Sequence, residues 1–263
     1  MQPEGPRTIV VNSIFGPMLA FEDDHATRQI LAFGAHTRNE VALLTSFVDP
    51  GDLIYDAGAH IGTFAIPLAN AAGSAGRLIA IEADPDNFAL LRRNLDRQGL
   101  GDRALAVYGI AGGQDVLHRA QRTSGHTSAT WFTPDPAGEA VSTIQLDDLH
   151  LSLADPRPVA VIKIDVEGME LAVLRSAQQL LARDRPILYI EIALEQMARY
   201  RVACGDIEAF LRPHGYRFFR NVGDRNSRHD GFRLAELSGL AEGGPFYDVL
   251  AIPAASPRLE RAV

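Results

Sequence analysis

Residues 53–65, LIYDAGAHIGTFA, decide the fold of this 263-residue chain. The stretch begins with apolar residues in the pattern of a buried strand, and after Gly62 it continues in the spacing of a helix. Gly58 and Gly62 lie four positions apart, and the acid Asp56 comes just before them. A strand that turns tightly into a helix needs small residues, which also let a ligand lie against the backbone. We therefore expect a ligand-binding turn, although close packing of helix against strand would also explain the two glycines.

Strand-like and helix-like patterns alternate on the carboxyl side of this turn. Helices are predicted over residues 62–72, 84–100, 169–184 and 206–216. Further strands are predicted over residues 77–83, 104–112, 141–149, 159–168, 186–193, 216–222 and 246–253. Such alternation predicts an α/β fold with a doubly wound, mostly parallel sheet and helices on both faces. We expect seven strands in this sheet, of which the last two form a closing pair.

The two ends of the chain are expected to differ from this central part. Residues 8–11 and 18–21 predict a hairpin, and residues 39–48 have helical spacing. We therefore divide the chain into a short N-terminal β/α extension over residues 1–50, a main domain over residues 51–253 and a tail over residues 254–263, which is expected to fray.

The charge balance argues against nucleic acid as a partner. The chain has 25 Lys and Arg residues against 33 Asp and Glu residues, a formal net charge of −8, whereas phosphate backbones need clustered basic residues. Cys204 is the only cysteine, so no disulfide can form within the chain, as is usual in a reducing compartment. The sequence shows neither a signal peptide nor the ~20 apolar residues of a membrane helix. We therefore expect a cytoplasmic protein with no membrane partner.

The residue types around the turn favour one class of cofactor. Glu82 ends the next predicted strand, where a carboxylate can accept hydrogen bonds from both ribose hydroxyls of an adenosine group. The turn lacks the G-x-G-x-x-G pattern of dinucleotide sites, and no lysine follows Gly62 as in a phosphate-binding loop. Asp56 would repel a phosphate but suits a cationic ligand. S-adenosylmethionine has an adenosine, an ammonium and a sulfonium group and no phosphate, so we expect it to bind here.

Acids at the ends of later strands are candidates for the chemistry. If the methyl acceptor is a hydroxyl it must lose its proton, so a base helps. Asp165 is the first candidate, although it could instead cap the following helix. Glu167 could likewise be an acid at a helix start, and His60 could shape the cofactor site rather than act as a base. Lys163 is expected to pair with an acid, and Asp165 with Glu191 gives too few ligands to predict a metal site.

Two motifs, DAGAHIGTFA at residues 56–65 and KIDVEGMELAVL at residues 163–174, resemble the FkbM family of S-adenosylmethionine-dependent methyltransferases. Two positions depart from the family pattern, since His60 stands where the family usually has Asn and Ala83 where it usually has Pro. Further elements of the resemblance are Glu82-Ala83, Asn94-Leu95, Leu146–Leu149 and Glu191-Ile192.

The resemblance implies a class I methyltransferase with a Rossmann-like fold. It implies that Glu82 binds the ribose and that the backbone near Ile110 and Ala111 binds the adenine. The catalytic candidates are Asp165, Glu167 and His60. The expected cofactor-binding residues are Asp56, Gly58, Ala59, His60, Gly62, Glu82, Asn87, Ile110, Ala111 and Asp165.

The expected function is O-methylation of a hydroxyl on a sugar, a polysaccharide or a secondary metabolite. The partner is then a small-molecule or glycan acceptor, and a homo-oligomer stays open. Residues 113–142 lack clear periodicity, so we expect an irregular loop that covers the acceptor. The alternatives are methylation of a carboxylate or an amine, a non-catalytic S-adenosylmethionine-binding module, and a nicotinamide-binding oxidoreductase.

Overall fold

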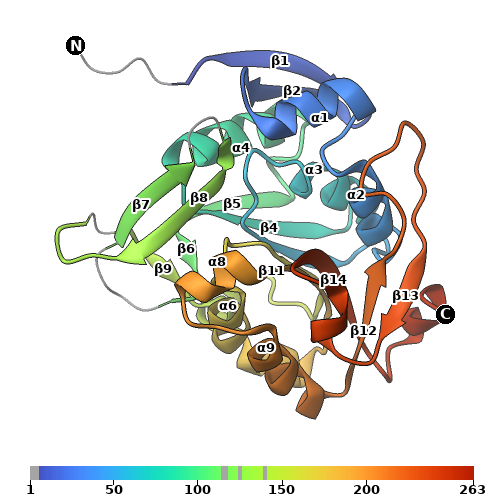
Figure 1. Ribbon diagram of the computed structural model, residues 1–263. Helices are drawn as coiled ribbons and strands as arrows, with labels where there is room; N and C mark the ends of the chain where they lie inside the picture. Colours follow the sequence, from blue (N-terminus) through green and yellow to red (C-terminus); the bar gives the residue numbers. More distant parts are fainter. Residues whose placement is uncertain (1–5, 114–117, 124–125, 139–140) are drawn as a thin grey trace.

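The computed structural model describes residues 6–113, 118–123, 126–138 and 141–263. Its centre is a sheet of eight strands (Figure 1). From one edge to the other, the strands are β13 (Leu234–Leu237), β12 (Tyr216–Asn221), β14 (Phe246–Pro253), β11 (Ile187–Ala193), β10 (Val159–Ile164), β3 (Leu53–Ala57), β4 (Arg77–Glu82) and β5 (Ala104–Tyr108).

The sheet is mostly parallel, as predicted. Strands β11, β10, β3, β4 and β5 run parallel to one another, and β14 lies antiparallel between β11 and β12. β13 pairs antiparallel with β12 at the edge, so the sheet has eight strands rather than the seven expected. The strand order reverses between β3 and β10, because the chain runs from β3 outward to β5 and then returns to β10 on the other side. In such sheets ligands bind at this reversal, beyond the carboxyl ends of the strands.

Helices cover both faces of the sheet because the central strands are apolar on both sides. Ile54 and Tyr55 are adjacent in β3, are both fully buried, and belong to different core clusters. One cluster includes apolar residues of α2 (Arg38–Thr45), α3 (Ala65–Ala71) and α4 (Pro85–Arg97). The other includes apolar residues of α6 (Glu170–Ser176), α7 (Gln178–Arg183), α8 (Leu194–Arg199) and α9 (Cys204–Leu211).

The N-terminal residues contain the predicted hairpin, formed by β1 (Thr8–Ser13) and β2 (Gly16–Phe21), and a helix α1 (His25–Phe33) before α2. Asn94 of α4 accepts the N–H of Leu19 at 2.7 Å and donates to the carbonyl of Leu19 at 2.9 Å, which joins the hairpin to helix α4. Helix α1 was not predicted, although its two ends carry ordinary capping signals. Asp24 caps the start by accepting the N–H of Ala26, and Gly34 ends the helix at a φ of 84°.

The prediction of a strand over residues 141–149 was wrong. This range contains only the two-residue strand β9 (Thr143–Ile144), which pairs with β6 (Ile110–Ala111), and helix α5 (Leu146–Leu151) follows. Leu146 is fully buried at the first turn of α5. Asp147 accepts the N–H groups of Gln179 and Leu180 at the start of α7, so the acid serves a helix contact rather than a strand.

The predicted irregular loop over residues 113–142 is in part a hairpin. Strands β7 (His118–Thr123) and β8 (His126–Pro134) pair antiparallel, while residues 114–117, 124–125 and 139–140 lie outside the described part of the chain. The hairpin lies beside the carboxyl ends of the parallel strands (Figure 1).

The C-terminal tail, which was expected to fray, contains a short helix and an ion pair. Residues Pro257–Arg261 form the 3₁₀ helix η3, and Arg258 makes two hydrogen bonds to the carboxylate of Asp52, at 2.7 and 2.8 Å. Two shorter 3₁₀ turns are η1 (Arg212–His214) and η2 (Leu240–Gly243). Within the described ranges, no helix combines the length and the apolar character that crossing a bilayer requires.

Candidate active site

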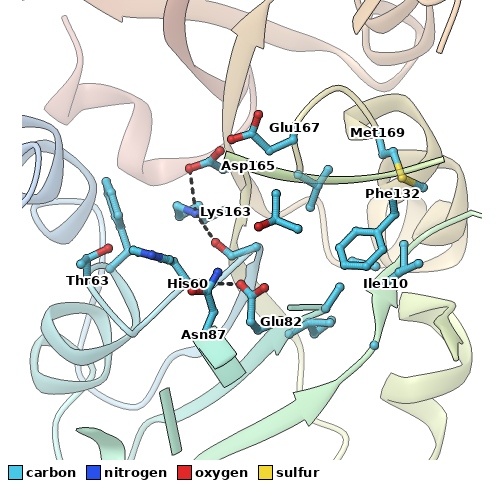
Figure 2. A pocket seen from close by; sticks show the side chains of 18 of the residues that line it. His60, Thr63, Glu82, Asn87, Ile110, Phe132, Lys163, Asp165, Glu167 and Met169 are labelled. Atoms are coloured by element: carbon cyan, nitrogen blue, oxygen red, sulfur yellow. Dashed lines mark hydrogen bonds and ion pairs between the residues drawn. The ribbon is translucent and has the colours of Figure 1, made fainter. Parts of the chain in front are cut away.

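A cavity opens where the strand order reverses, at the carboxyl ends of β3 and β10 (Figure 2). It encloses about 750 Å³ of space between protein atoms, part of which is open to solvent. Its walls come from the glycine turn after β3, the end of β4, the short strand β6, the hairpin strand β8 and the segment after β10. The predicted ligand site therefore coincides with a hollow in the structure.

The glycine turn lies against the backbone that follows β10. Gly58 has a φ of 80°, and a Cβ atom at this position would lie only 1.8 Å from the carbonyl oxygen of Asp165. Only glycine can therefore occupy this position without moving one of the two backbones. The N–H groups of Gly58 and Ala59 both donate to the carbonyl of Ile81 at 3.0 Å, which fixes the turn on β4 as well. Gly58 therefore both packs closely against a neighbouring backbone and lines the cavity.

Glu82 lies at the end of β4 with only 8% of its surface exposed, and it lines the cavity. Its Oε2 accepts the N–H of His60 at 2.7 Å and its Oε1 accepts the N–H of Asp84 at 2.8 Å. Each carboxylate oxygen has a second lone pair, so Glu82 can accept two more hydrogen bonds in fixed directions. Burial raises the pKa of Glu82 to about 7, against the lowering effect of these backbone hydrogen bonds.

An apolar slot lies beside Glu82 in the cavity. Ile110, Phe132 and Met169 are each at most 8% exposed and pack together as a small cluster. Ile110 was expected near the adenine, but Phe132 was not predicted individually. Thr130 donates to the second carboxylate oxygen of Asp84 at 3.1 Å, and this bond holds β8 over the start of α4. A flat apolar ring fits such a slot.

Lys163 and Asp165 form the floor and one wall of the cavity (Figure 2). The Lys163 side chain is 2% exposed and lies 3.3 Å from Oδ2 of Asp165, whose own side chain is 37% exposed. Helix α6 begins at Glu170. The side chain of Glu170 accepts the N–H groups of Val166 and Gly168 and so holds the turn that precedes the helix. Asp165 is therefore not a helix cap, and its carboxylate is available to the cavity.

Two further acids follow Asp165. Glu167 lines the cavity at a φ of 57°, which is unusual for a residue with a side chain, and it precedes α6 rather than starting it. Burial, and then the charges of Asp165 and Glu170, raise the pKa of Glu167 to about 8. Glu170 is 1% exposed, and burial raises its pKa to about 7.

The structure brings most of the predicted site residues to this cavity and leaves three behind its wall. Asp56 is fully buried within the sheet and pairs with Lys163 at 3.1 Å, while Ala59 and Gly62 face the packed interior of the turn. The predicted residues that line the cavity are Gly58, His60, Glu82, Asn87, Ile110, Ala111, Asp165 and Glu167.

The cavity also contains residues that sequence reasoning missed. His36 lies between α1 and α2 and reaches the cavity from the N-terminal part of the chain, beside Thr63 and Phe64. Burial, and then the charge of His60, lower the pKa of His36 to about 3, so its ring is neutral. Its Nδ1 has no hydrogen-bond partner among the described residues. No local pattern in the sequence marks this histidine, because only the fold brings it to the site.

The acids do not gather as metal ligands in the described part of the chain. No group of three or more His, Cys, Asp or Glu side chains there could hold a metal ion. Glu191, the second acid considered for a cation, lies opposite Asp248 of β14 and does not line the cavity.

Residues 56–218 match the methyltransferase FkbM domain. The chain belongs to the FkbM methyltransferase family. This family is one of methyltransferases, and S-adenosylmethionine is its cofactor. The match to the family begins at Asp56, near the end of β3, and therefore includes every predicted site residue.

Among curated proteins, this FkbM methyltransferase is similar to the hexuronic acid methyltransferase AglP of Haloferax volcanii. The two are 30% identical over 136 residues, which cover 51% of this chain and 54% of the relative. Similar solved structures include fibrillarin from Aeropyrum pernix with bound S-adenosyl-L-methionine (15% identity, 95% of this chain and 84% of that chain, TM-score 0.45). The methyltransferase FkbM of Methylobacillus flagellatus KT is another (20% identity, 78% of this chain and 44% of that chain, TM-score 0.44).

Proposed function

We propose that this FkbM methyltransferase methylates a hydroxyl oxygen of a sugar or glycan acceptor, with Asp165 as the group that receives the proton. The observation that carries the proposal is the position of Asp165, whose carboxylate is bound on one side by Lys163 and exposed on the other side to the cavity. The name of the Haloferax volcanii relative, a hexuronic acid methyltransferase, supports a sugar acceptor.

The residues of the cavity fit S-adenosylmethionine. Glu82 would accept the two ribose hydroxyls with the lone pairs that its backbone partners leave, and the slot of Ile110, Phe132 and Met169 would hold the adenine. Gly58 would border the methionine part. The bound cofactor supplies a methyl group on a sulfonium, a good leaving group, so positioning contributes much of the rate.

Asp165 would act on the acceptor rather than on the cofactor. A sugar hydroxyl is a weak nucleophile until its proton is removed, and a carboxylate within hydrogen-bond reach can take that proton as the new bond forms. Lys163 lies on the buried side of Asp165, so the exposed side faces an incoming hydroxyl. Glu167, with its raised pKa, would donate rather than accept a hydrogen bond near neutral pH.

A carboxylate acceptor is the second candidate, because a hexuronic acid carries both a carboxyl and hydroxyl groups. A carboxylate has no proton to lose and gains nothing from a base beside it. Asp165 would instead repel it, and the ammonium of Lys163 is already engaged. These contacts favour the hydroxyl.

The test uses methyl-labelled S-adenosylmethionine with a panel of neutral sugars, hexuronic acids and their oligosaccharides. A hydroxyl acceptor gives a methyl ether that survives mild alkali, whereas a carboxyl acceptor gives an ester that alkali hydrolyses. Alkali-stable label in a sugar is the expected result. Alkali-labile label would show that the acceptor group is a carboxyl rather than a hydroxyl. Cofactor binding without any transfer would favour a non-catalytic module.

A further inference from the structure

Lys163 is buried in an otherwise apolar strand, with 2% of its side chain exposed. Burying an ammonium group in this way is unfavourable unless hydrogen bonds and opposite charges compensate it. The chain could place an isoleucine or leucine here at no such cost, as it does at the neighbouring positions Ile162 and Ile164. The lysine therefore calls for an explanation beyond packing.

Three acceptors from three segments surround this ammonium. Oδ1 of Asp56 in β3 lies 3.1 Å from Nζ, the carbonyl oxygen of Gly58 in the glycine turn lies 3.1 Å away, and Oδ2 of Asp165 lies 3.3 Å away. The contact to Gly58 is a hydrogen bond, and the contacts to the two carboxylates are ion pairs. Lys163 thus connects the cofactor turn to the acid on the acceptor side (Figure 2).

The two acids differ in what they can do. Asp56 is fully buried and does not reach the cavity, so its role ends at neutralising the lysine. Asp165 is 37% exposed and could rotate toward solvent, because nothing on the cavity side holds it in the described residues. The ammonium binds its Oδ2 and so fixes which oxygen remains for the acceptor.

We propose that Lys163 is a positioning residue of the transfer reaction, which acts through Asp165 by holding that carboxylate at the edge of the cavity. The inference rests on the proposed function, since it assigns the lysine to the same step. It separates Lys163 from a purely structural role, in which the lysine would only compensate the buried charge of Asp56.

The test is a double-mutant cycle with Asp165→Asn. Lys163→Arg keeps the positive charge but changes the donor geometry. Asp56→Asn/Lys163→Met removes one buried charge of each sign and leaves none uncompensated in the sheet. Each change should slow single-turnover transfer about 100-fold when Asp165 is present, and less than about threefold further in the Asp165→Asn background. Thermal unfolding and cofactor titration calorimetry control for fold and binding.

Rate losses that multiply across the two backgrounds would overturn the proposal, and so would an Asp56→Asn/Lys163→Met protein that transfers at nearly the wild-type rate. If one variant does not fold, the other decides. A readout without acceptor is the carboxylate ¹³C signal of Asp165, assigned from its loss in Asp165→Asn. It should move in both Lys163 variants, and an unmoved signal contradicts the contact. Failure of the wild-type protein to transfer a methyl group would refute the proposed function. The ¹³C signal of Asp165 would then still test whether Lys163 holds this carboxylate.

Discussion

The carboxylates of Glu82 and Asp165 keep fixed directions because neighbouring donors bind them. Glu82 is held by the backbone N–H groups of His60 and Asp84, and Asp165 by the ammonium of Lys163. Replacing either acid by alanine would also leave these donors without a partner, which costs about 1–3 kcal/mol for a buried group. Amide replacements keep the shape and remove the charge, so they report on function more cleanly.

Asp165→Asn should slow methyl transfer by about 10²- to 10⁴-fold, because the amide cannot take up the hydroxyl proton. Cofactor affinity should stay close to that of the wild type, since the ribose and adenine contacts lie elsewhere in the cavity. The measurement is the single-turnover rate with saturating cofactor and acceptor. A rate within a few-fold of that of the wild type would show that Asp165 is not the base, and Glu167 or His60 would then be the next candidate.

Glu82→Gln should weaken S-adenosylmethionine binding by about 1–3 kcal/mol, because two hydroxyls lose a charged acceptor. The pKa of Glu82 is about 7, so the carboxylate is ionised above this pH and protonated below it. Wild-type affinity should therefore rise as pH increases through 7 and then level off. Titration calorimetry from pH 6 to 8 checks this, with the Gln variant as the control that should lack the step. Equal affinity of the two proteins at pH 8 would show that Glu82 does not bind the cofactor.

At the scale of elements, the cavity depends on two segments that lie outside the parallel core. The segment between α1 and α2 contributes His36, and the hairpin strand β8 contributes Thr130 and Phe132. We expected the range of residues that contains this hairpin to cover the acceptor. That expectation stays a prediction. In the proposed placement of the cofactor, Thr130 and Phe132 lie at the adenosine end of the cavity, and we propose that His36 lies at the acceptor end.

Paired alanine variants test this division. Phe132→Ala should weaken cofactor binding, because the adenine loses one wall of its slot, and should leave the acceptor KM nearly unchanged. His36→Ala should do the opposite and raise the acceptor KM about tenfold, the effect of about one hydrogen bond. Cofactor calorimetry and acceptor kinetics on both proteins give the comparison. If His36→Ala weakens the cofactor instead, the two ends of the cavity are reversed.

The sequence predicts the elements of the parallel core well because their signals are local. Strands such as β3 and β10 are buried on both faces and read as continuous apolar runs, and α4 carries a cap, Asp84, and an arginine in its last turn. The hairpin of β7 and β8 escapes prediction because its strands are largely polar. His36 escapes it because a residue without a local motif reaches the cavity only through tertiary packing.

At the scale of the whole molecule, burial of acids makes stability depend on pH. Burial raises the pKa of Glu82, Glu170 and Asp248 to about 7 and that of Glu167 to about 8. The folded protein holds these protons at pH values where the unfolded chain releases them, so each contribution to stability is lost as pH rises toward 8. Buried histidines with a lowered pKa, such as His36, act in the opposite sense but only below the ordinary histidine value of 6.5.

Without cofactor, the free energy of unfolding should therefore fall between pH 6.5 and pH 8.5. The slope is at most about 1.4 kcal/mol per pH unit for each acid that is still protonated. Urea unfolding at several pH values in this range gives the measurement. Glu167→Gln should flatten the upper part of the curve, because it removes the acid that titrates last among these four. A stability that stays level or rises over this range would contradict the raised pKa values.

The contact between Gly58 and the backbone of Asp165 has a consequence for how the two positions vary among homologues. A methyl group at position 58 would overlap the carbonyl oxygen of residue 165, so neither backbone can change its path alone. The two positions lie far apart in the gene but must vary as a pair. Across homologues, we expect any loss of this glycine to coincide with changes in the segment that contains Asp165. In homologues that have lost methyl transfer, we expect the glycine and the segment that contains Asp165 to have changed together.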